Sequence, residues 1–292
     1  MKNVLVTGSN GQLASCIKDL EKQYKNLKLI YTDYQELDIC DLNQLNTFFK
    51  SNSKIHYCIN CAAYTAVDKA ETDVDKAYEI NAQGAKNLAI VCHEFDVVLI
   101  HISTDFVFDG QKNEPYVETD VANPISVYGA SKLQGEIEIK QILEKYFILR
   151  TSWLYSEHGN NFMKTMLRLA ETRDEISVVS DQIGTPTYAG DLAEVILKIM
   201  SLKNTNFGLY HYSNEGATSW YDFAKAIFEA SNLKIKTNPI KSAAYPTPAK
   251  RPAYSVLDKT KIKKTLRIQA PFWSESLQKA VKVTVLRNTY YD

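Results

Sequence analysis

A tyrosine and a lysine four residues apart, Tyr128 and Lys132, are well suited to proton chemistry. If the segment Tyr128-Gly129-Ala130-Ser131-Lys132 is helical, both side chains leave the same face of the helix. The pKa of a tyrosine is roughly 10 in water, and a neighbouring cation favours the ionised phenol. The same spacing also occurs on solvated helix edges, so a functional interpretation depends on the segments that position the pair.

The composition is that of an ordinary globular enzyme, with 292 residues of which 45% are hydrophobic and 23% charged. The 34 basic residues balance the 34 acidic ones, so we expect neither nucleic acid nor an anionic membrane as a partner. The chain enters directly into Val4-Leu5-Val6, which leaves no room for a signal peptide. With an odd number of cysteines, five, this predicts a cytoplasmic protein. Cys58 and Cys61 have C-x-x-C spacing, but without a second ligand pair we interpret them as small buried thiols.

Apolar runs and helical patterns alternate from Val4 to Arg150, which predicts an α/β fold with a doubly wound parallel sheet of the Rossmann type. We assign 1–152 to a dinucleotide-binding domain and 153–292 to a smaller C-terminal substrate-binding lobe, partly interwoven with the first. Strands are expected at 3–7, 29–32, 57–61, 97–102, 147–150, 176–179 and 209–212. Helices are expected after residue 14 through residue 20, and at 42–50, 74–95, 128–143, 162–171, 191–200, 219–230 and 272–281. Asn81 and Gly84 interrupt the longest helix, and we expect close packing or a backbone interaction to compensate for them.

The first strand runs into a glycine turn, Gly8-Ser9-Asn10-Gly11-Gln12-Leu13-Ala14. Such a turn lets backbone amides at a helix N-terminus approach a pyrophosphate, although its spacing, G-x-x-G-x-x-A, departs from the usual dinucleotide fingerprint. A plain turn with two glycines is the alternative. Asp33 ends the second strand, where a carboxylate can accept hydrogen bonds from ribose hydroxyls. No basic residue follows closely, so NADH is favoured over NADPH.

Polar residues follow the other strands of the predicted sheet. Thr104 and Asp105 come directly after the fourth strand, where parallel sheets bind ligands, and a hydroxyl there can donate to a carbonyl oxygen. His101, within that strand, is expected to be a core histidine. The segment 115–124 is expected to be a surface loop over the active site.

Several motifs together resemble the extended short-chain dehydrogenase/reductases, and more closely a branch that reduces nucleotide sugars. The resemblance covers almost the whole chain, and it rests on Thr7-Gly8-x-x-Gly11-Gln12-Leu13, Ala62-Ala63-Tyr64-Thr65-Ala66-Val67-Asp68, Ser103-Thr104-Asp105-Phe106-Val107-Phe108, Tyr128-x-x-x-Lys132, Arg150-Thr151-Ser152-Trp153-Leu154-Tyr155, Gly159-Asn160-Asn161-Phe162, Asp181-Gln182-x-Gly184-x-Pro186-Thr187 and Tyr245-Pro246-Thr247-Pro248-Ala249-x-Arg251-Pro252.

The resemblance implies reduction of dTDP-4-dehydro-6-deoxy-L-mannose at C4 to dTDP-L-rhamnose, with NADH or NADPH as hydride donor. In this scheme Tyr128 is the general acid, Lys132 holds the nicotinamide ribose and lowers the pKa of Tyr128, and Thr104 bonds the reacting oxygen. Asn81 supports the site. The cofactor would contact Gly8, Asn10, Gly11, Gln12, Leu13, Asp33, Asp38, Ile39, Ala62, Ala63, Tyr64, Tyr128 and Lys132. The substrate would contact Thr104, Asp105, Trp153 and Arg251, the last through its diphosphate, although a solvent-facing arginine is the alternative.

Some proteins of this branch bind a divalent ion through carboxylates at a dimer interface. The corresponding positions here are Ser15 and Gly190, which offer no carboxylate, so we expect no such metal and either a monomer or a homodimer.

Two other functions remain open. A nucleotide-sugar dehydratase or epimerase shares the superfamily, but Phe106 stands after Asp105 where dehydratases carry a glutamate. A non-catalytic regulatory subunit of a methionine adenosyltransferase also resembles this fold, although the complete set of Thr104, Tyr128 and Lys132 weighs against it.

Overall fold

A computed structural model describes residues 1–52 and 54–289 of the chain. Its centre is a six-stranded parallel sheet in the order β10-β5-β4-β3-β1-β2. The strands are β1 (Lys2–Thr7), β2 (Leu27–Thr32), β3 (Ile55–Asn60), β4 (Val98–Thr104), β5 (Tyr146–Thr151) and β10 (Gly208–His211). The predicted doubly wound parallel sheet is therefore confirmed.

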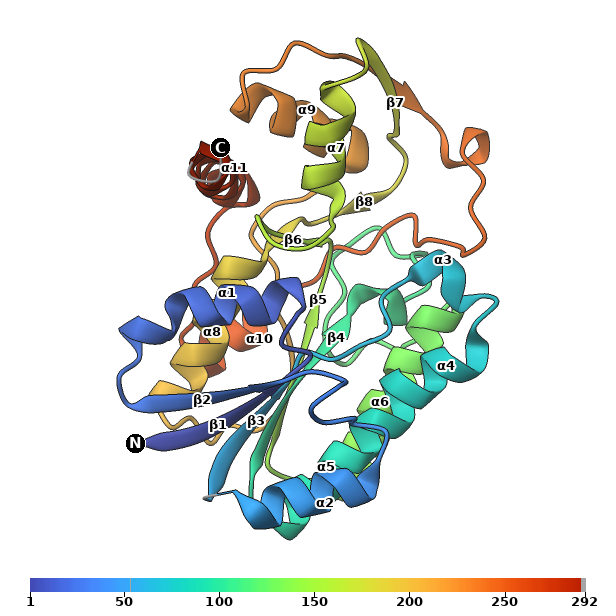
Figure 1. The fold of residues 1–292 in the computed structure, drawn as a ribbon. Helices are drawn as coiled ribbons and strands as arrows, with labels where there is room; N and C mark the ends of the chain where they lie inside the picture. The colour runs from blue at the N-terminus through green and yellow to red at the C-terminus, as the bar shows by residue number, and fades with distance from the viewer. Residues whose placement is uncertain (53, 290–292) are drawn as a thin grey trace.

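Helices cover both faces of this sheet, as Figure 1 shows. On one side lie α1 (Gln12–Leu20), α8 (Ala189–Ser201) and α10 (Thr260–Leu266), and on the other α2 (Leu42–Ser51), α5 (Gly84–Glu94) and α6 (Val127–Ile142). Successive side chains of β1 serve the two cores in turn: Val4 and Val6 pack in the first, and Leu5 in the second. A strand buried on both faces has no polar face to show, which explains its continuous apolar run.

The predicted helix at 74–95 consists of α4 (Val74–Tyr78), a π-helical turn, η2 (Glu79–Gln83), and α5. Asn81 lies in this turn and is 1% exposed. Its side chain accepts from Tyr64 N–H (2.8 Å) and donates to Tyr64 O (3.1 Å) and Ser131 Oγ (3.0 Å). Gly84 packs against Ile39, whose Cδ1 would lie 2.6 Å from an added Cβ. Both interruptions of the helical pattern thus have the compensating contacts expected of them.

The C-terminal part of the chain contributes to two regions. Above the sheet in Figure 1, α7 (Phe162–Ala170), α9 (Trp220–Ala230) and α11 (Trp273–Thr289) form a smaller lobe with the parallel pair β7 (Glu175–Val179) and β12 (Lys236–Ile240). By contrast, α8, β10 and α10 complete the sheet and its core. The lobe and the sheet are therefore interwoven along the sequence, and α10 is a helix that the sequence analysis did not predict.

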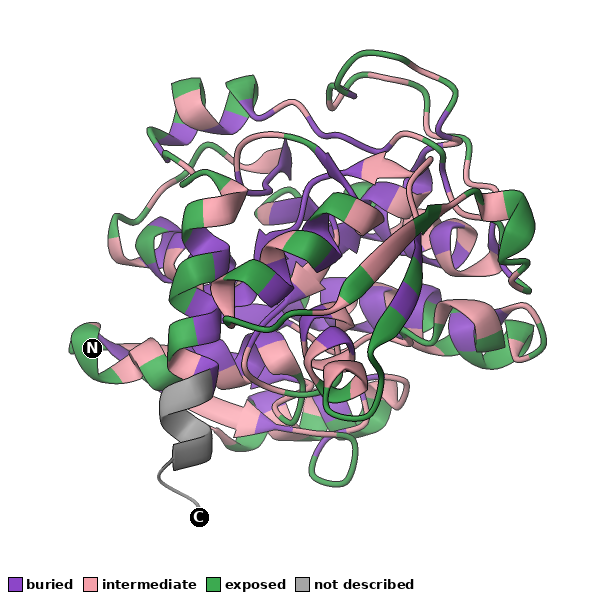
Figure 2. Ribbon diagram, turned by 90° about the horizontal axis from the view of Figure 1, so that it is seen from above, coloured by how far each residue is buried: buried purple, intermediate pink, exposed green. Residues whose placement is uncertain are grey.

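Short elements connect these parts: η1 (Glu21–Gln23), α3 (Val67–Ala70), η3 (Asp105–Val107), β6 (Leu154–Tyr155), β8 (Ile183–Gly184), β9 (Thr187–Tyr188), β11 (Thr218–Ser219) and η4 (Ser242–Ala244). Figure 2 shows the buried residues gathered at the centre of the molecule, with exposed ones along the outer helices and loops. Within residues 1–52 and 54–289, no helix has both the length and the apolar character needed to cross a bilayer.

Most residues of the segment 115–124 are exposed or half-buried, as expected of a surface loop, and one buried aromatic residue anchors it. Tyr116 is 2% exposed and stacks on Phe108, with ring centroids 4.1 Å apart. Glu118 accepts a hydrogen bond from the His211 N–H of the edge strand β10 at 2.9 Å. This segment therefore secures the edge of the sheet, because an aromatic residue within it finds a buried partner.

Candidate active site

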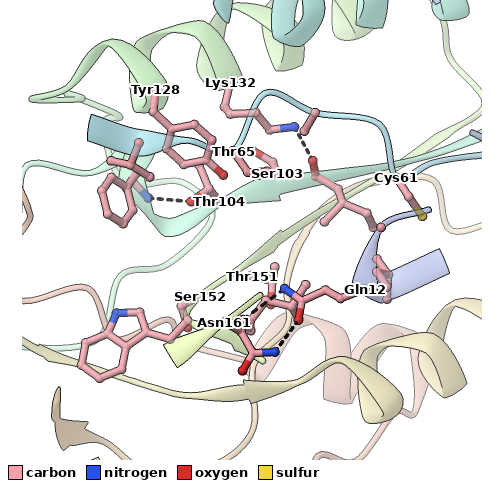
Figure 3. Close-up of a pocket in the computed structure, with 18 of the residues that line it drawn as sticks. Gln12, Cys61, Thr65, Ser103, Thr104, Tyr128, Lys132, Thr151, Ser152 and Asn161 are labelled. Atoms are coloured by element: carbon pink, nitrogen blue, oxygen red, sulfur yellow. Dashed lines mark hydrogen bonds between the residues drawn. The ribbon is translucent and has the colours of Figure 1, made fainter. Parts of the chain in front are cut away.

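A cavity of about 670 Å³ lies between the carboxyl ends of the strands and the smaller lobe. Its walls come from the β1–α1 turn, the ends of β3 and β4, helix α6 and the segment after β5, with Trp220 and Arg251 from the later chain. In Figure 3, Tyr128 and Lys132 extend from the same helix into this space, and the Tyr128 hydroxyl lies toward Thr104. The structure thus brings the three predicted catalytic residues into one cavity.

Helix α6 holds Tyr128 and Lys132 because of how it begins and packs. Ser126 caps the helix by accepting from Gly129 N–H at 3.2 Å. Gly129 allows the helix to approach η3 closely, since an added Cβ would lie 2.1 Å from Phe106 O. Phe106 in turn meets the Tyr128 ring edge-on, at 5.5 Å between centroids.

The pKa of Tyr128 differs from the expectation. Burial raises it to about 12; contact with Thr104 lowers it and the nearby Asp105 carboxylate raises it further. Lys132 is not among the groups that shift the pKa of Tyr128 here, so the lowering expected from it is not seen and burial dominates. A phenol that keeps its proton at neutral pH is able to donate it.

Lys132 is 2% exposed, and burial lowers its pKa to about 8 while Glu136 opposes that shift. Its Nζ donates to Ile102 O at 2.6 Å and lies 3.4 Å from His101 Nε2. His101 is 1% exposed, as expected for a core histidine.

Thr104 ends β4 at the cavity wall, and Asp105 begins η3 directly after it. Thr104 Oγ1 accepts from Phe106 N–H (3.2 Å) and donates to Asp105 Oδ1 (3.1 Å). Burial raises the pKa of Asp105 to about 6, against the opposing effects of Ser255 and Thr104. This site therefore holds a carboxyl group that titrates close to neutrality.

The glycine turn meets the requirements of a pyrophosphate site. Gly8 has φ +64°, and a Cβ there would lie 2.6 Å from Ala62 N, so the turn must pass close to the chain after β3. No side chain caps the N-terminus of α1, which begins after Gly11. Asn10, Gly11, Gln12 and Leu13 line the cavity together with Ala62 and Ala63. Uncapped backbone amides at a helix N-terminus are a favourable site for a phosphate.

Five predicted cofactor residues do not line the cavity: Gly8 and the four described next. Asp33 accepts from Asn10 N–H (2.7 Å) and Tyr34 N–H (2.8 Å), so it shapes the turn. Asp38 accepts from Cys40 N–H (2.9 Å), and Ile39 is buried under Gly84. Tyr64 points its hydroxyl to Asp73 (2.9 Å).

Trp153 contributes an aromatic wall on the side of the smaller lobe. Its ring stacks on Trp220 with centroids 3.5 Å apart and planes inclined by 8°. It has φ +47°, an uncommon conformation for a bulky residue, and Gly184 leaves it room, since a Cβ there would lie 2.5 Å from the indole. The sequence analysis missed Trp220, because this residue lies far from Trp153 in the sequence and nothing there indicates that the two rings stack.

Arg251 lines the cavity but is not free. Its guanidinium binds both oxygens of Asp68, at 3.0 and 2.7 Å, and donates to Ala249 O at 3.0 Å. Arg251 is the main reason why the pKa of Asp68 lies below its usual value. The motif Ala62–Asp68 and the proline-rich loop are thus joined by this ion pair.

The sequence analysis missed much of the polar wall after β5. Its lining residues are Thr151, Ser152, Gly159, Asn160 and Asn161, and Thr65 and Ser103 add polar groups from the loop after β3 and the end of β4. Gln12 anchors this segment to α1 by donating to Leu154 O (3.3 Å) and accepting from Ser156 Oγ (3.2 Å). The quoted motifs contain all of these lining residues, but the motifs alone did not show that the residues face one cavity.

The positions considered for a metal hold other contacts. Ser15 Oγ donates to Gly11 O (3.0 Å), and Gly190 packs against the Tyr188 ring. Nearby, Cys16, Glu157 and His158 each offer a ligand atom within 4.8 Å of the others. His158 also bonds Asp19 at 2.7 Å.

Comparison with known proteins assigns the chain to a family. The model of the RmlD substrate binding domain matches residues 1–285. A dTDP-4-dehydrorhamnose reductase of Aggregatibacter actinomycetemcomitans is 44% identical over 288 residues, which cover 95% of this chain and 98% of the relative. This chain belongs to the dTDP-4-dehydrorhamnose reductase family. Another relative, 41% identical over 280 residues, is the spore coat polysaccharide biosynthesis protein SpsK of Bacillus subtilis, with 95% of this chain and 96% of that protein covered.

Solved structures of the family have the same fold. A dTDP-4-dehydrorhamnose reductase from Clostridium acetobutylicum is 46% identical with a TM-score of 0.92, and the match covers 96% of this chain and 99% of that one. The enzyme from Bacillus anthracis, solved in complex with NADP, is 42% identical with a TM-score of 0.92, covering 97% and 100%. Family membership over nearly the full length thus agrees with the resemblance drawn from the motifs.

Proposed function

We propose that this protein reduces dTDP-4-dehydro-6-deoxy-L-mannose at C4 to dTDP-L-rhamnose, with a reduced nicotinamide dinucleotide as hydride donor. The observation that carries the proposal is the convergence of Thr104, Tyr128 and Lys132 in one cavity beside an uncapped helix N-terminus. The names of the relatives support the choice of substrate.

In this scheme the residues of the chain have distinct roles. The bound dinucleotide supplies hydride to the carbonyl carbon. Tyr128 gives its phenolic proton to the carbonyl oxygen, and Thr104 holds that oxygen by a hydrogen bond. Asn10, Gly11, Gln12 and Leu13 receive the pyrophosphate through the N-terminus of α1.

The smaller lobe and the proline-rich loop would bind the sugar nucleotide. Asp105 and Trp153 would contact the sugar, since both line the cavity that also holds Thr104. Arg251 would meet the diphosphate only by sharing or leaving its bond to Asp68. The remaining residues proposed for the cofactor would act through the glycine turn and the loops after β2 and β3: Gly8, Asp33, Asp38, Ile39, Ala62, Ala63 and Tyr64.

We favour NADH over NADPH because Asp33 would repel a 2′-phosphate. The residues after it, Tyr34-Gln35-Glu36, add no positive charge. A relative binds NADP, so the comparison of the two donors is a direct test. A lower KM for NADPH than for NADH would overturn the preference.

The experiment that tests the function follows oxidation of NADH and, separately, NADPH at 340 nm by the purified protein. The substrate is generated in place by the enzymes that supply it, and the product is identified by mass spectrometry and NMR. Formation of dTDP-L-rhamnose supports the proposal. Cofactor binding without turnover would contradict it and favour a regulatory subunit.

We further propose that the protein is a monomer or a homodimer. In either case we expect no magnesium ion at the positions of Ser15 and Gly190. Metal analysis and light scattering of the purified protein test this. A stoichiometric magnesium ion that holds a dimer together would contradict it.

A further inference from the structure

A chain of buried polar groups leads from the first strand to Lys132. Thr7 Oγ1 donates to Asn60 Oδ1 (2.8 Å), Asn60 Nδ2 lies 3.0 Å from His101 Nδ1, and His101 Nε2 lies 3.4 Å from Lys132 Nζ. All four residues are at most 2% exposed. These groups are buried and cannot exchange their partners for water. Which atom donates and which accepts at one contact therefore decides the donor and acceptor at the next contact.

The orientation of the Asn60 side-chain amide sets the direction in which hydrogen bonds are donated along this series. Its Oδ1 also accepts from the Ala62 backbone N–H at 3.2 Å. A backbone N–H can only donate, so the oxygen of the amide must face Ala62 and the NH₂ group must face His101. The opposite orientation would oppose two donors at Ala62.

The Asn60 amide in turn selects the form of His101. Since Asn60 Nδ2 donates, His101 Nδ1 must accept, and the single imidazole proton lies on Nε2. The charged imidazole, with protons on both nitrogens, is excluded by the same contact. Burial and the nearby Lys132 agree, because both lower the pKa of His101 well below its usual value.

The Nε2 proton therefore faces Lys132 Nζ. An ammonium has three donors and no acceptor, so with the charged lysine this contact opposes two donors. A neutral amine can accept the imidazole proton with its lone pair and still donate to Ile102 O. We propose that Asn60 and His101 are positioning residues that favour release of a proton from Lys132 and so set the alkaline limit of the reductase activity.

The other charged and titratable groups around Lys132 do not supply this effect. Glu136, on the same helix, favours the charged lysine, but it is held by Arg150 at 2.8 and 2.7 Å and by Lys140 at 3.2 Å. Cys61 acts in the same direction as Glu136, yet burial raises its pKa to about 12, so its thiol is uncharged near neutrality. Tyr128 and Asp105, which line the same cavity, are the remaining titratable neighbours. Among the described residues, His101 is the titratable side chain whose ring nitrogen lies within hydrogen-bond distance of Lys132 Nζ.

The first test is NMR spectroscopy of the full-length protein with ¹⁵N-labelled histidines. Long-range proton–nitrogen spectra distinguish the two neutral tautomers and the charged form, and the chain has five histidines, so assignment by single variants is practical. We expect the Nε2–H tautomer for His101 between pH 6 and 8. An Nδ1–H tautomer or a charged ring would overturn the proposal. In Asn60→Asp, whose side chain can only accept when ionised, the proton should move to Nδ1.

The second test is the pH profile of kcat/KM, and it rests on the proposed reductase function. In His101→Gln the side-chain oxygen can turn to Lys132 and accept from its ammonium. The alkaline limb should then move to higher pH by about one unit, which corresponds to ~1.4 kcal/mol. His93→Gln, on the exposed side of α5, is the matched control and should leave the limb unchanged.

The two tests fail separately. If no substrate is turned over, the proposed function is wrong, while the tautomer still reports on the arrangement of Asn60, His101 and Lys132. If turnover is normal but the limb does not move in His101→Gln, or moves to lower pH, the role of His101 is overturned.

Discussion

Asp105 lowers the stability of the folded protein when it is ionised, although we propose that it contacts the substrate. Its carboxyl group is 2% exposed and has a pKa of about 6, with burial as the largest cause. A group whose pKa is higher in the folded than in the unfolded protein binds its proton more tightly when folded. Stability therefore falls as pH rises from about 4, the unfolded pKa, to 6, and then stays constant.

The variant Asp105→Asn removes this cost. At pH 8 we expect its free energy of unfolding to exceed that of the wild type by up to about 3 kcal/mol. At pH 4 we expect nearly the same free energy of unfolding for both proteins. Urea unfolding at the two pH values measures the difference. A variant less stable than the wild type at pH 8 would contradict the argument. Turnover should fall, because the residue faces the proposed substrate.

Tyr128→Phe removes one oxygen atom from the proposed proton donor. We expect kcat to fall by about 10²–10⁴-fold, the usual contribution of general acid catalysis, with little change in the Kd of the dinucleotide. Stopped-flow turnover and fluorescence titration separate the two quantities. Phe106→Leu, at the edge of the same ring, is a control that keeps the phenol. Near-normal turnover by Tyr128→Phe would remove the acid assignment.

At this scale the sequence predicted the types of residue well and their interactions poorly. The spacing of Tyr128 and Lys132 and the position of Thr104 after a strand were enough to place them together. The pKa of Tyr128 could not be predicted, because burial depends on the packing of the whole helix. Nor could the contact of His101 with Lys132, which joins a strand to a helix 31 residues later.

Among the elements, α6 is fixed by two glycines that let its backbone approach other backbone. Gly129 meets Phe106 O, and Gly135 meets the π-helical turn, where an added Cβ would lie 2.2 Å from Asn81 O. Gly129 lies between Tyr128 and Lys132 and Gly135 follows three residues after Lys132, so the two contacts hold the part of the helix that carries the pair.

A methyl group at Gly135 has no room, since the contact is to backbone. Gly135→Ala should lower the free energy of unfolding by about 1–3 kcal/mol, as overpacking does. It should also lower kcat by moving α6 relative to Thr104. Ile137→Ala, at a side chain that is 37% exposed, serves as the control on the same helix. Unchanged stability and turnover in Gly135→Ala would show that the helix can shift freely.

Most element boundaries followed from apolar runs and caps to within a few residues, but α11, which was expected to end at 281, extends to Thr289. Asp41 is an example of such a cap, since it caps α2 by accepting from Asn43 and Gln44 N–H at 2.9 and 3.0 Å. The π-helical turn was not predictable as such, because it depends on the bonds of Asn81 to Tyr64 and Ser131. Helix α10 was missed because it is short and has only two buried apolar residues, Ile262 and Leu266. These two residues pack in the same core cluster as Tyr210 of β10, and the sequence does not show this contact.

For the whole molecule, the main feature is that late segments complete an early core. Residues of α8, β10 and α10 pack in the same cluster as Val4, Val6 and Ile17. Strand β5 pairs with β4 on one side and with β10 on the other. The alternating pattern ends at Arg150, so the sequence alone could not show which later segments return to the sheet.

The fragment 1–152 should therefore not fold by itself. Without α8 and β10 it would leave one edge of β5 unpaired and the apolar face of α1 exposed. We expect it to aggregate or to bind the dye ANS, and to lack a cooperative thermal transition. The full chain is the control. A soluble fragment with a cooperative transition that binds the dinucleotide would show that the first 152 residues are autonomous.

The stacked indoles of Trp153 and Trp220 have an optical consequence. The chain has three tryptophans, and these two face the cavity in near-parallel contact. Their coupled transitions should give a strong near-ultraviolet circular dichroism signal, and their emission should change when a sugar nucleotide displaces water from their faces. Intrinsic tryptophan fluorescence and circular dichroism should therefore report whether the site is occupied. The affinity for a sugar nucleotide can then be measured on the unmodified protein.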